Sequence, residues 1–180
     1  MNTMKEDFRQ TVQHWKESLG VYSDATFAMK PDPNSWSAGQ LYSHLISATQ
    51  RTFLLIEKCL TGNANSNELK TQRGEDALKT RILSLSKVQV PAHRENPPAQ
   101  PAGTAGIAES LDALILKYQA LADTTKTSVI TGKEKHPILG FMNAAEWLET
   151  THLHWQHHVK QKEEINRFLG KSGQLQTKTA

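Results

Sequence analysis

The sequence predicts an all-α protein, a four-helix bundle with one long crossover between two of its helices. Four segments carry apolar residues at spacings of three and four, which is typical of one helix face, and no segment shows sustained strand alternation. The connection over residues 62–104 is too long for a tight hairpin and favours helices that are parallel or not adjacent. We expect one domain over residues 1–170, followed by a polar, mobile tail over residues 171–180.

The first two helices are bounded by stop and start signals. The first is expected over residues 5–19, where apolar residues recur at helical spacing and Gly20 follows as a stop. Residues 30–35 contain two prolines and cannot be helical throughout. The second helix is expected to begin near Ser37, a plausible N-cap, and to end at residues 61–63. Its apolar face is broad, as expected for a helix packed inside a bundle.

The connection after the second helix is the least regular part of the chain. Residues 77–90 fit either a short helix or an extended piece, and the prolines within residues 91–104 enforce an open conformation. The third helix is expected over residues 106–124, a loop over residues 125–140, and a fourth helix over residues 143–169.

Charge and composition exclude several classes of protein. The formal net charge is only +3, and acidic and basic residues are interspersed, so the sequence lacks the basic patch of a nucleic-acid or membrane-surface protein. No apolar run approaches the roughly 20 residues that span a bilayer, and the polar N-terminus lacks the apolar core of a secretory signal. The single Cys59 rules out an internal disulfide and fits a small buried side chain. We therefore expect a cytoplasmic protein that acts on a small molecule.

A cluster of histidines in the fourth helix is the strongest chemical signal. Four of the eight histidines lie between positions 152 and 158. Counted at about 100° per residue from the apolar centre near Thr151, His158 lies about 20° away and His154 about 60° away. His152 at about 100° and His157 at about 120° fall at or beyond the boundary of the apolar face. His154 and His158 therefore form the inward pair, at the i,i+4 spacing that lets two imidazoles bind one divalent metal ion.

The third ligand must come from another helix, and His44 is the best candidate. It lies at the edge of the apolar face of the second helix, with small polar neighbours rather than bulky aliphatic ones. Three neutral imidazoles and one open position are the pattern of a catalytic zinc centre. Nickel, iron and manganese are also compatible, because imidazole is a broad ligand. Glu146 and Glu149 are expected to face outward, which argues against either as a general base.

Two further residues are candidates for contact with the metal ligands or the substrate. Gln161 lies one turn beyond His158, where it can hydrogen-bond a ligand imidazole or a bound substrate. His136 precedes a proline, so it is expected in a loop, either near the metal or as part of a turn that positions the fourth helix.

The chain resembles the DinB-like superfamily of metal-binding helical bundles, which includes the YfiT-type proteins. The resemblance rests on Trp36-Ser37 followed by His44, on residues 136–140, on residues 146–148, and on the histidine run of residues 154–161. It covers roughly residues 5–168. It implies an up-up-down-down bundle with a metal held by His44, His154 and His158.

The resemblance implies activity only in outline. Characterised members include bacillithiol S-transferases and mycothiol-dependent maleylpyruvate isomerases, in which a metal is thought to activate a low-molecular-weight thiol. The resemblance therefore implies a metal-dependent transferase or isomerase that uses a small thiol. A non-catalytic metal- or ligand-binding bundle and a metal-dependent hydrolase remain as alternatives. A homodimer is also expected, because four helices leave little area to cover the long connection.

Overall fold

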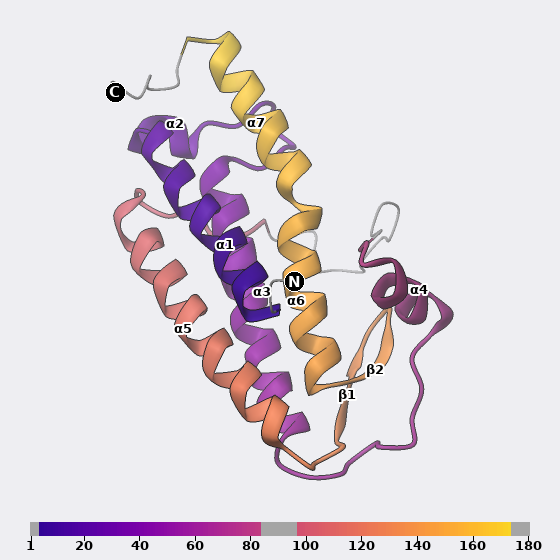
Figure 1. Ribbon diagram of the computed structural model, residues 1–180. Helices are drawn as coiled ribbons and strands as arrows, with labels where there is room; N and C mark the ends of the chain where they lie inside the picture. The colour runs from indigo at the N-terminus through magenta and orange to yellow at the C-terminus, as the bar shows by residue number, and fades with distance from the viewer. Residues whose placement is uncertain (1–3, 84–96, 174–180) are drawn as a thin grey trace.

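The computed structural model describes residues 4–83 and 97–173 and is mostly helical. In chain order its elements are α1 (Met4–Glu17), the 3-10 turn η1 (Ser18–Val21), α2 (Asp24–Ala28), α3 (Ala38–Cys59), α4 (Gln72–Thr80), α5 (Ala105–Thr127), β1 (Lys133–His136), β2 (Gly140–Asn143), α6 (Ala144–His157) and α7 (Val159–Lys171) (Figure 1). None of the helices in these two ranges is long and apolar enough to cross a membrane.

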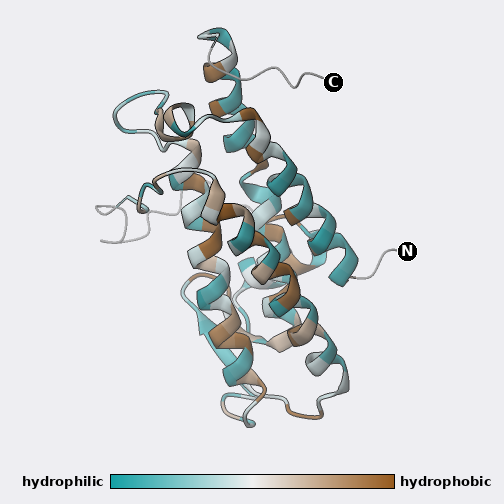
Figure 2. Cartoon of the chain, turned by 90° about the vertical axis from the view of Figure 1, so that its left-hand side faces the viewer, coloured by the Kyte–Doolittle hydropathy of each residue, from teal (hydrophilic) through white to brown (hydrophobic). Residues whose placement is uncertain are grey.

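The longer helices α1, α3, α5 and α6 pack against one another. α1 and α5 are antiparallel, because the Lys5 ammonium pairs with Asp123 at one end and the Lys16 ammonium pairs with Asp112 at the other. Figure 2 shows hydrophilic and hydrophobic bands alternating along these helices. In α1 the buried residues Phe8, Val12 and Trp15 recur at the helical spacing that the sequence predicts.

Contacts along α3 fix the direction of the remaining helices. The indole N–H of Trp155 donates to Thr49, and the Cys59 thiol meets the backbone oxygen of Met142, so α3 and α6 are antiparallel. The chain therefore runs up, down, down and up through α1, α3, α5 and α6 (Figure 1), which corrects the up-up-down-down order. A short link after α2 returns the chain antiparallel to α1, whereas the long connection lets α5 run parallel to α3, as its length predicts.

The loop expected over residues 125–140 is wrong in part, because it contains the antiparallel hairpin β1–β2. Each strand is only four residues long, too short to give an alternating pattern in the sequence. Gly140 begins β2 with φ +82°, and a Cβ there would lie 2.5 Å from the Thr71 backbone nitrogen. The hairpin thus presses against the start of α4, and only glycine fits at the contact.

Three other boundaries differ from expectation. The fourth helix is two helices, α6 and α7, separated at His158. The short helix α4 begins before residue 77, because the Thr71 hydroxyl caps its first turn. α2 adds a short capped helix before the proline-containing link. The expectations for residues 84–96, and for residues 174–180 of the tail, lie outside the described residues.

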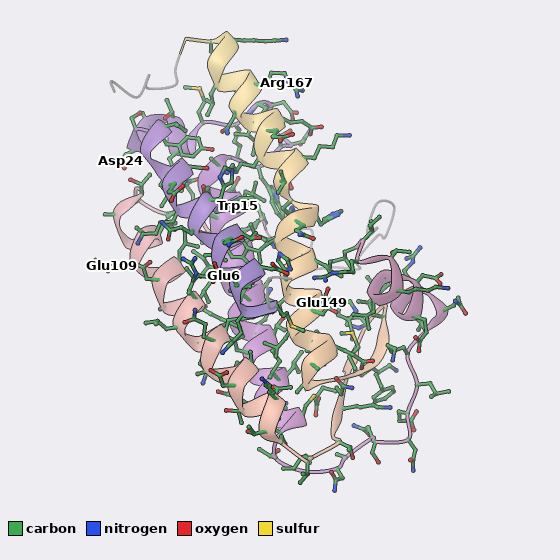
Figure 3. The ribbon with its side chains drawn as sticks, in the orientation of Figure 1. Glu6, Trp15, Asp24, Glu109, Glu149 and Arg167 are labelled. Atoms are coloured by element: carbon green, nitrogen blue, oxygen red, sulfur yellow. The ribbon has the colours of Figure 1, made fainter. Side chains whose placement is uncertain are left out.

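An aromatic layer joins the helices at the middle of the core. Phe8 stacks on Tyr118 with ring centroids 3.9 Å apart, and Trp15 meets Trp155 edge-on at 5.4 Å. The Tyr42 hydroxyl donates to the backbone oxygen of Trp15, which is labelled in Figure 3. All five side chains are buried. Each contributes roughly 1.5–3 kcal/mol by leaving water, so this layer holds α3 and α6 in fixed relative positions.

Candidate metal centre

His44 is positioned by the start of α3. The Ser37 side chain accepts the backbone N–H of Gln40, and the Gln40 side chain accepts the backbone N–H of Ser37, a reciprocal capping box. This box sets where the helix begins, and it places His44 in the second turn. The prediction that Ser37 is the N-cap is confirmed.

His154 and His158 come from the junction of α6 and α7. His154 lies in the last turn of α6, and His158 is the junction residue itself, with φ −86° and ψ −2°. This backbone remains near the helical region, so the i,i+4 relation of the two side chains survives the interruption. The side chains of His154 and His158 thus both point toward His44.

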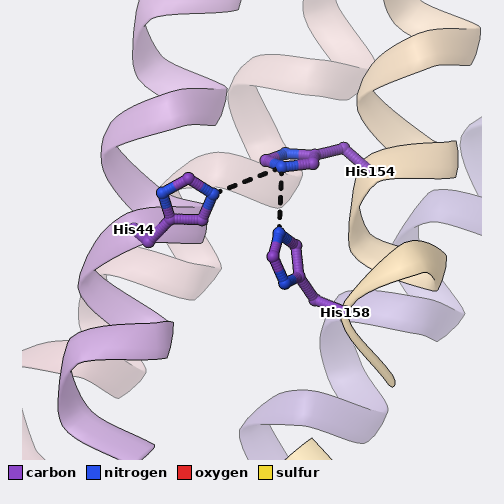
Figure 4. A group of neighbouring side chains, drawn as sticks. All are labelled: His44, His154 and His158. Atoms are coloured by element: carbon purple, nitrogen blue, oxygen red, sulfur yellow. Dashed lines mark hydrogen bonds between the residues drawn. The ribbon is translucent and has the colours of Figure 1, made fainter. Parts of the chain in front are cut away.

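The three imidazoles meet through their Nε2 atoms (Figure 4). His44 Nε2 lies 3.3 Å from His154 Nε2, which lies 3.1 Å from His158 Nε2. The three ligand atoms all lie within 4.8 Å of one another. All three side chains are partly buried. Figure 4 shows one ring from α3 facing two rings from the other side. The three candidate ligands are thus brought together by helices far apart in sequence.

The spacing of these nitrogens fits a small divalent cation. Zinc–nitrogen bonds of 2.0–2.1 Å at tetrahedral angles put two ligand nitrogens about 3.3 Å apart. The two Nε2–Nε2 distances, 3.3 Å from His44 to His154 and 3.1 Å from His154 to His158, lie close to that value. No carboxylate or thiol of the described residues joins this group. The donor set is therefore three imidazole nitrogens, which suits zinc, nickel, iron or manganese.

Burial keeps the three imidazoles neutral, as metal ligands must be. Burial, together with a smaller effect of the neighbouring His158, lowers the pKa of His44 to about 4. Burial likewise lowers the pKa of His158 to about 4, against the opposing effect of its hydrogen bond with Gln161. The pKa of His154 is also well below its usual range, chiefly through burial. Each ring therefore offers a nitrogen lone pair at neutral pH.

Gln161 and Trp36 contact two of these rings directly. Gln161 Oε1 lies 2.8 Å from His158 Nδ1 and accepts the ring N–H there, which leaves His158 Nε2 as the lone-pair nitrogen. The Trp36 ring lies 4.9 Å from the His44 ring. The sequence pointed to Gln161 by its helical position. In the sequence, Trp36 is one of the residues that carry the resemblance to the DinB-like superfamily. Its contact with His44 is a result of the fold.

His136 is not among the three grouped histidines, although it lies close enough to His154 to help lower the pKa of that ring. Its Nδ1 accepts the backbone N–H groups of Ile138 and Leu139, at 3.1 and 3.0 Å. The ring also lies 5.4 Å from that of Trp147, at the start of α6. These contacts close the turn between β1 and β2, and they use the lone pair on Nδ1, which leaves the proton of the neutral ring on Nε2.

Two side chains of α6 are more buried than the helical phase suggests. His152 is buried, and its Nε2 lies 3.0 Å from the Thr11 hydroxyl. The outward position expected for Glu149 is wrong, because its carboxylate pairs with Arg81 and its side chain is only 14% exposed. α6 contacts α1 and α4 as well as α3, so its buried arc is wider than a single apolar stripe.

Glu146 has a structural role. It accepts the backbone N–H of Asn143 in the capping box that starts α6, and its other oxygen pairs with the Lys70 ammonium at 2.5 Å. His157 meets the ring of His158 edge-on, with centroids 5.1 Å apart, but is not among the three grouped ligands.

Comparison with known families gives one match. The family model of the DinB superfamily matches residues 6–161, a range that contains all three grouped histidines and Gln161. Neither a curated protein nor a solved structure matches the chain. Because the match spans most of the sequence, the chain belongs to the DinB superfamily.

Proposed function

We propose that this member of the DinB superfamily is a metal-dependent enzyme whose helical bundle holds one divalent cation on His44, His154 and His158. The convergence of three neutral Nε2 atoms, at spacings of 3.1 and 3.3 Å, carries the proposal. Zinc or nickel is the favoured ion, with iron and manganese also compatible with the three imidazoles. Three protein ligands leave a coordination position for a small molecule, as in catalytic rather than structural zinc sites.

The chemistry proposed is the activation of a small thiol for transfer or isomerisation. A divalent cation supplies Lewis acidity, which lowers the pKa of a thiol so that the nucleophilic thiolate exists at neutral pH. The protein contributes the arrangement around it: Gln161 fixes the tautomer of His158, and burial keeps the rings unprotonated. No carboxylate stands among the grouped ligand atoms of the described residues, so activation by the cation rather than by a general base is the favoured route.

One assay separates this function from its alternatives. The metal-loaded protein is given a panel of electrophiles with and without low-molecular-weight thiols. Thiol-dependent loss of an electrophile supports the transferase or isomerase. Loss without thiol supports the metal-dependent hydrolase, and binding without turnover supports a non-catalytic bundle. The same panel with His154→Ala is the control, since any activity that depends on the centre must disappear with this ligand.

A further inference from the structure

A surface pocket of about 370 Å³ lies next to the three-histidine centre. It is formed between the link that precedes α3 and the outer side of α7, two segments that lie next to each other in Figure 1. Its volume falls at the lower end of the range for small-molecule sites, about 300–1,000 Å³. The pocket can therefore hold part of a small ligand.

Two side chains of the pocket wall also contact the proposed metal ligands. Trp36 lies against the His44 ring, with centroids 4.9 Å apart. Gln161 accepts the N–H of His158 at 2.8 Å. Trp36 and Gln161 therefore each contact both the pocket and one of the proposed metal ligands.

The pocket has a definite charge. Glu164 is the one charged side chain of its wall, and in residues 4–83 and 97–173 its exposed carboxylate makes no hydrogen bond or ion pair. The Ser35 hydroxyl of the wall donates to Asp32, so a second carboxylate stands directly behind it. No lysine or arginine contributes to the wall. The one charged group of the wall is therefore a carboxylate, while Lys30 lies close enough to Asp32 to offset the charge behind Ser35.

The uncharged part of the wall also suits a cationic ligand. The indole face of Trp36 attracts a cation through its ring quadrupole. Gln161 uses its carbonyl oxygen on His158, which leaves its NH₂ group to donate to an uncharged acceptor on the ligand. A carboxylate, an indole face and an amide donor together favour a ligand with an ammonium group and oppose one with a carboxylate.

We propose that this pocket binds the ammonium-bearing arm of the small thiol or substrate whose other end reaches the metal, and that Glu164 determines this specificity. The inference rests on the proposed function for the second end of the ligand. It adds a substrate class, amine-bearing small molecules, and a residue that selects them.

The test uses three thiols of equal length: 3-aminopropane-1-thiol, 3-mercaptopropan-1-ol and 3-mercaptopropanoate. Their binding to the zinc-loaded full chain is measured by calorimetry. We expect the amine to bind about threefold to fivefold more tightly than the alcohol, the range of one exposed ion pair, and the carboxylate to bind most weakly. Glu164→Gln should remove the difference between amine and alcohol. Glu163→Gln, the same change at an exposed neighbour outside the pocket wall, should preserve it.

A second measurement keeps this inference separate from the proposed function. In the metal-free protein, the indole N–H resonance of Trp36 is followed by NMR during titration with 3-aminopropan-1-ol or propane-1,3-diol. A stronger response to the amine that Glu164→Gln abolishes supports the pocket even if no thiol binds the zinc-loaded protein. Equal binding of the three thiols and equal response to the two alcohols would overturn the inference. Loss of the preference in Glu163→Gln as well would also overturn it, since the effect would then be a general field of α7.

Discussion

Partly buried histidines in two regions of this protein are used differently. At the β-hairpin, His136 Nδ1 accepts two backbone N–H groups and closes a turn. Between α3 and the α6–α7 junction, the Nε2 atoms of His44, His154 and His158 meet only one another among the described residues. Burial lowers the pKa of His136 and of His44 to about 4 alike. The pKa therefore does not distinguish a structural histidine from a candidate ligand. The two kinds of histidine are distinguished by the group that each ring nitrogen contacts.

The difference has a simple physical origin. A backbone N–H satisfies a buried imidazole nitrogen at a fixed place in the chain, which suits a turn. Three lone pairs that converge on one point repel one another unless protons or a cation lie between them. Protein groups alone thus satisfy the His136 ring in the hairpin, whereas a bound cation would stabilise the three converging rings.

The largest expected effect is the loss of metal on removal of one ligand. His158→Ala takes away one of three nitrogens, and we expect zinc affinity to fall by more than about 100-fold, beyond the 10–100-fold typical of residues behind the ligands. Elemental analysis and competition with a chromogenic chelator measure this. His157→Ala is the matched control and should retain close to one metal ion per chain. Full metal content in His158→Ala would remove this residue from the centre.

Acid should destabilise the metal-free protein next most strongly. The folded pKa values of His44, His158 and His136 are about 4, below the ordinary value of about 6.5 expected in the unfolded chain. As the pH falls from about 6.5 to 4, the unfolded state takes up protons that the folded state does not, so the free energy of unfolding decreases over this window. Above about pH 6.5 these groups should cause no change.

Urea unfolding in the presence of a chelator, from pH 8 to pH 4, measures this dependence. His44→Gln and His136→Asn should each reduce the slope, since each removes one titrating ring. The prediction is wrong if the free energy of unfolding is constant between pH 7 and pH 5. With zinc present the fall should steepen, because protons also compete with the metal for the rings.

Changing the structural histidine should lower stability and leave metal binding intact. His136→Ala removes the acceptor of two backbone N–H groups, and we expect a loss of about 1–3 kcal/mol in the free energy of unfolding. Its zinc content should equal that of the unchanged protein. His136→Asn keeps a side-chain acceptor and should recover part of the stability. Loss of zinc in both variants at full stability would place His136 at the centre instead.

The smallest effect on metal binding is expected from a change at Gln161, which hydrogen-bonds the proposed ligand His158. Gln161→Leu leaves the His158 Nδ1–H without an acceptor, and we expect zinc affinity to fall about tenfold. Gln161→Glu keeps an acceptor and should bind zinc at least as tightly as the unchanged protein. Equal affinity in all three proteins would show that the tautomer of His158 does not depend on this contact.

Periodicity predicted most of the fold because the long helices bury one face each. The stripe in the first helix and the capping signal at Ser37 are local patterns, and the structure has them at the expected places. The hairpin and the start of α4 were missed because they depend on contact with each other, through Gly140 and Thr71. The break at His158 was missed because its backbone stays close to helical.

The sequence by itself determined that His154 and His158 share one helix face, since that follows from 3.6 residues per turn. It also made His44 the best third candidate, through its place at the edge of an apolar face. Only the tertiary structure decided that the three Nε2 atoms meet, that His136 is occupied by its own turn, and that α1 and α4 cover His152 and Glu149. These are contacts between segments far apart in the chain. A helical pattern specifies which face is buried, and packing alone specifies against what.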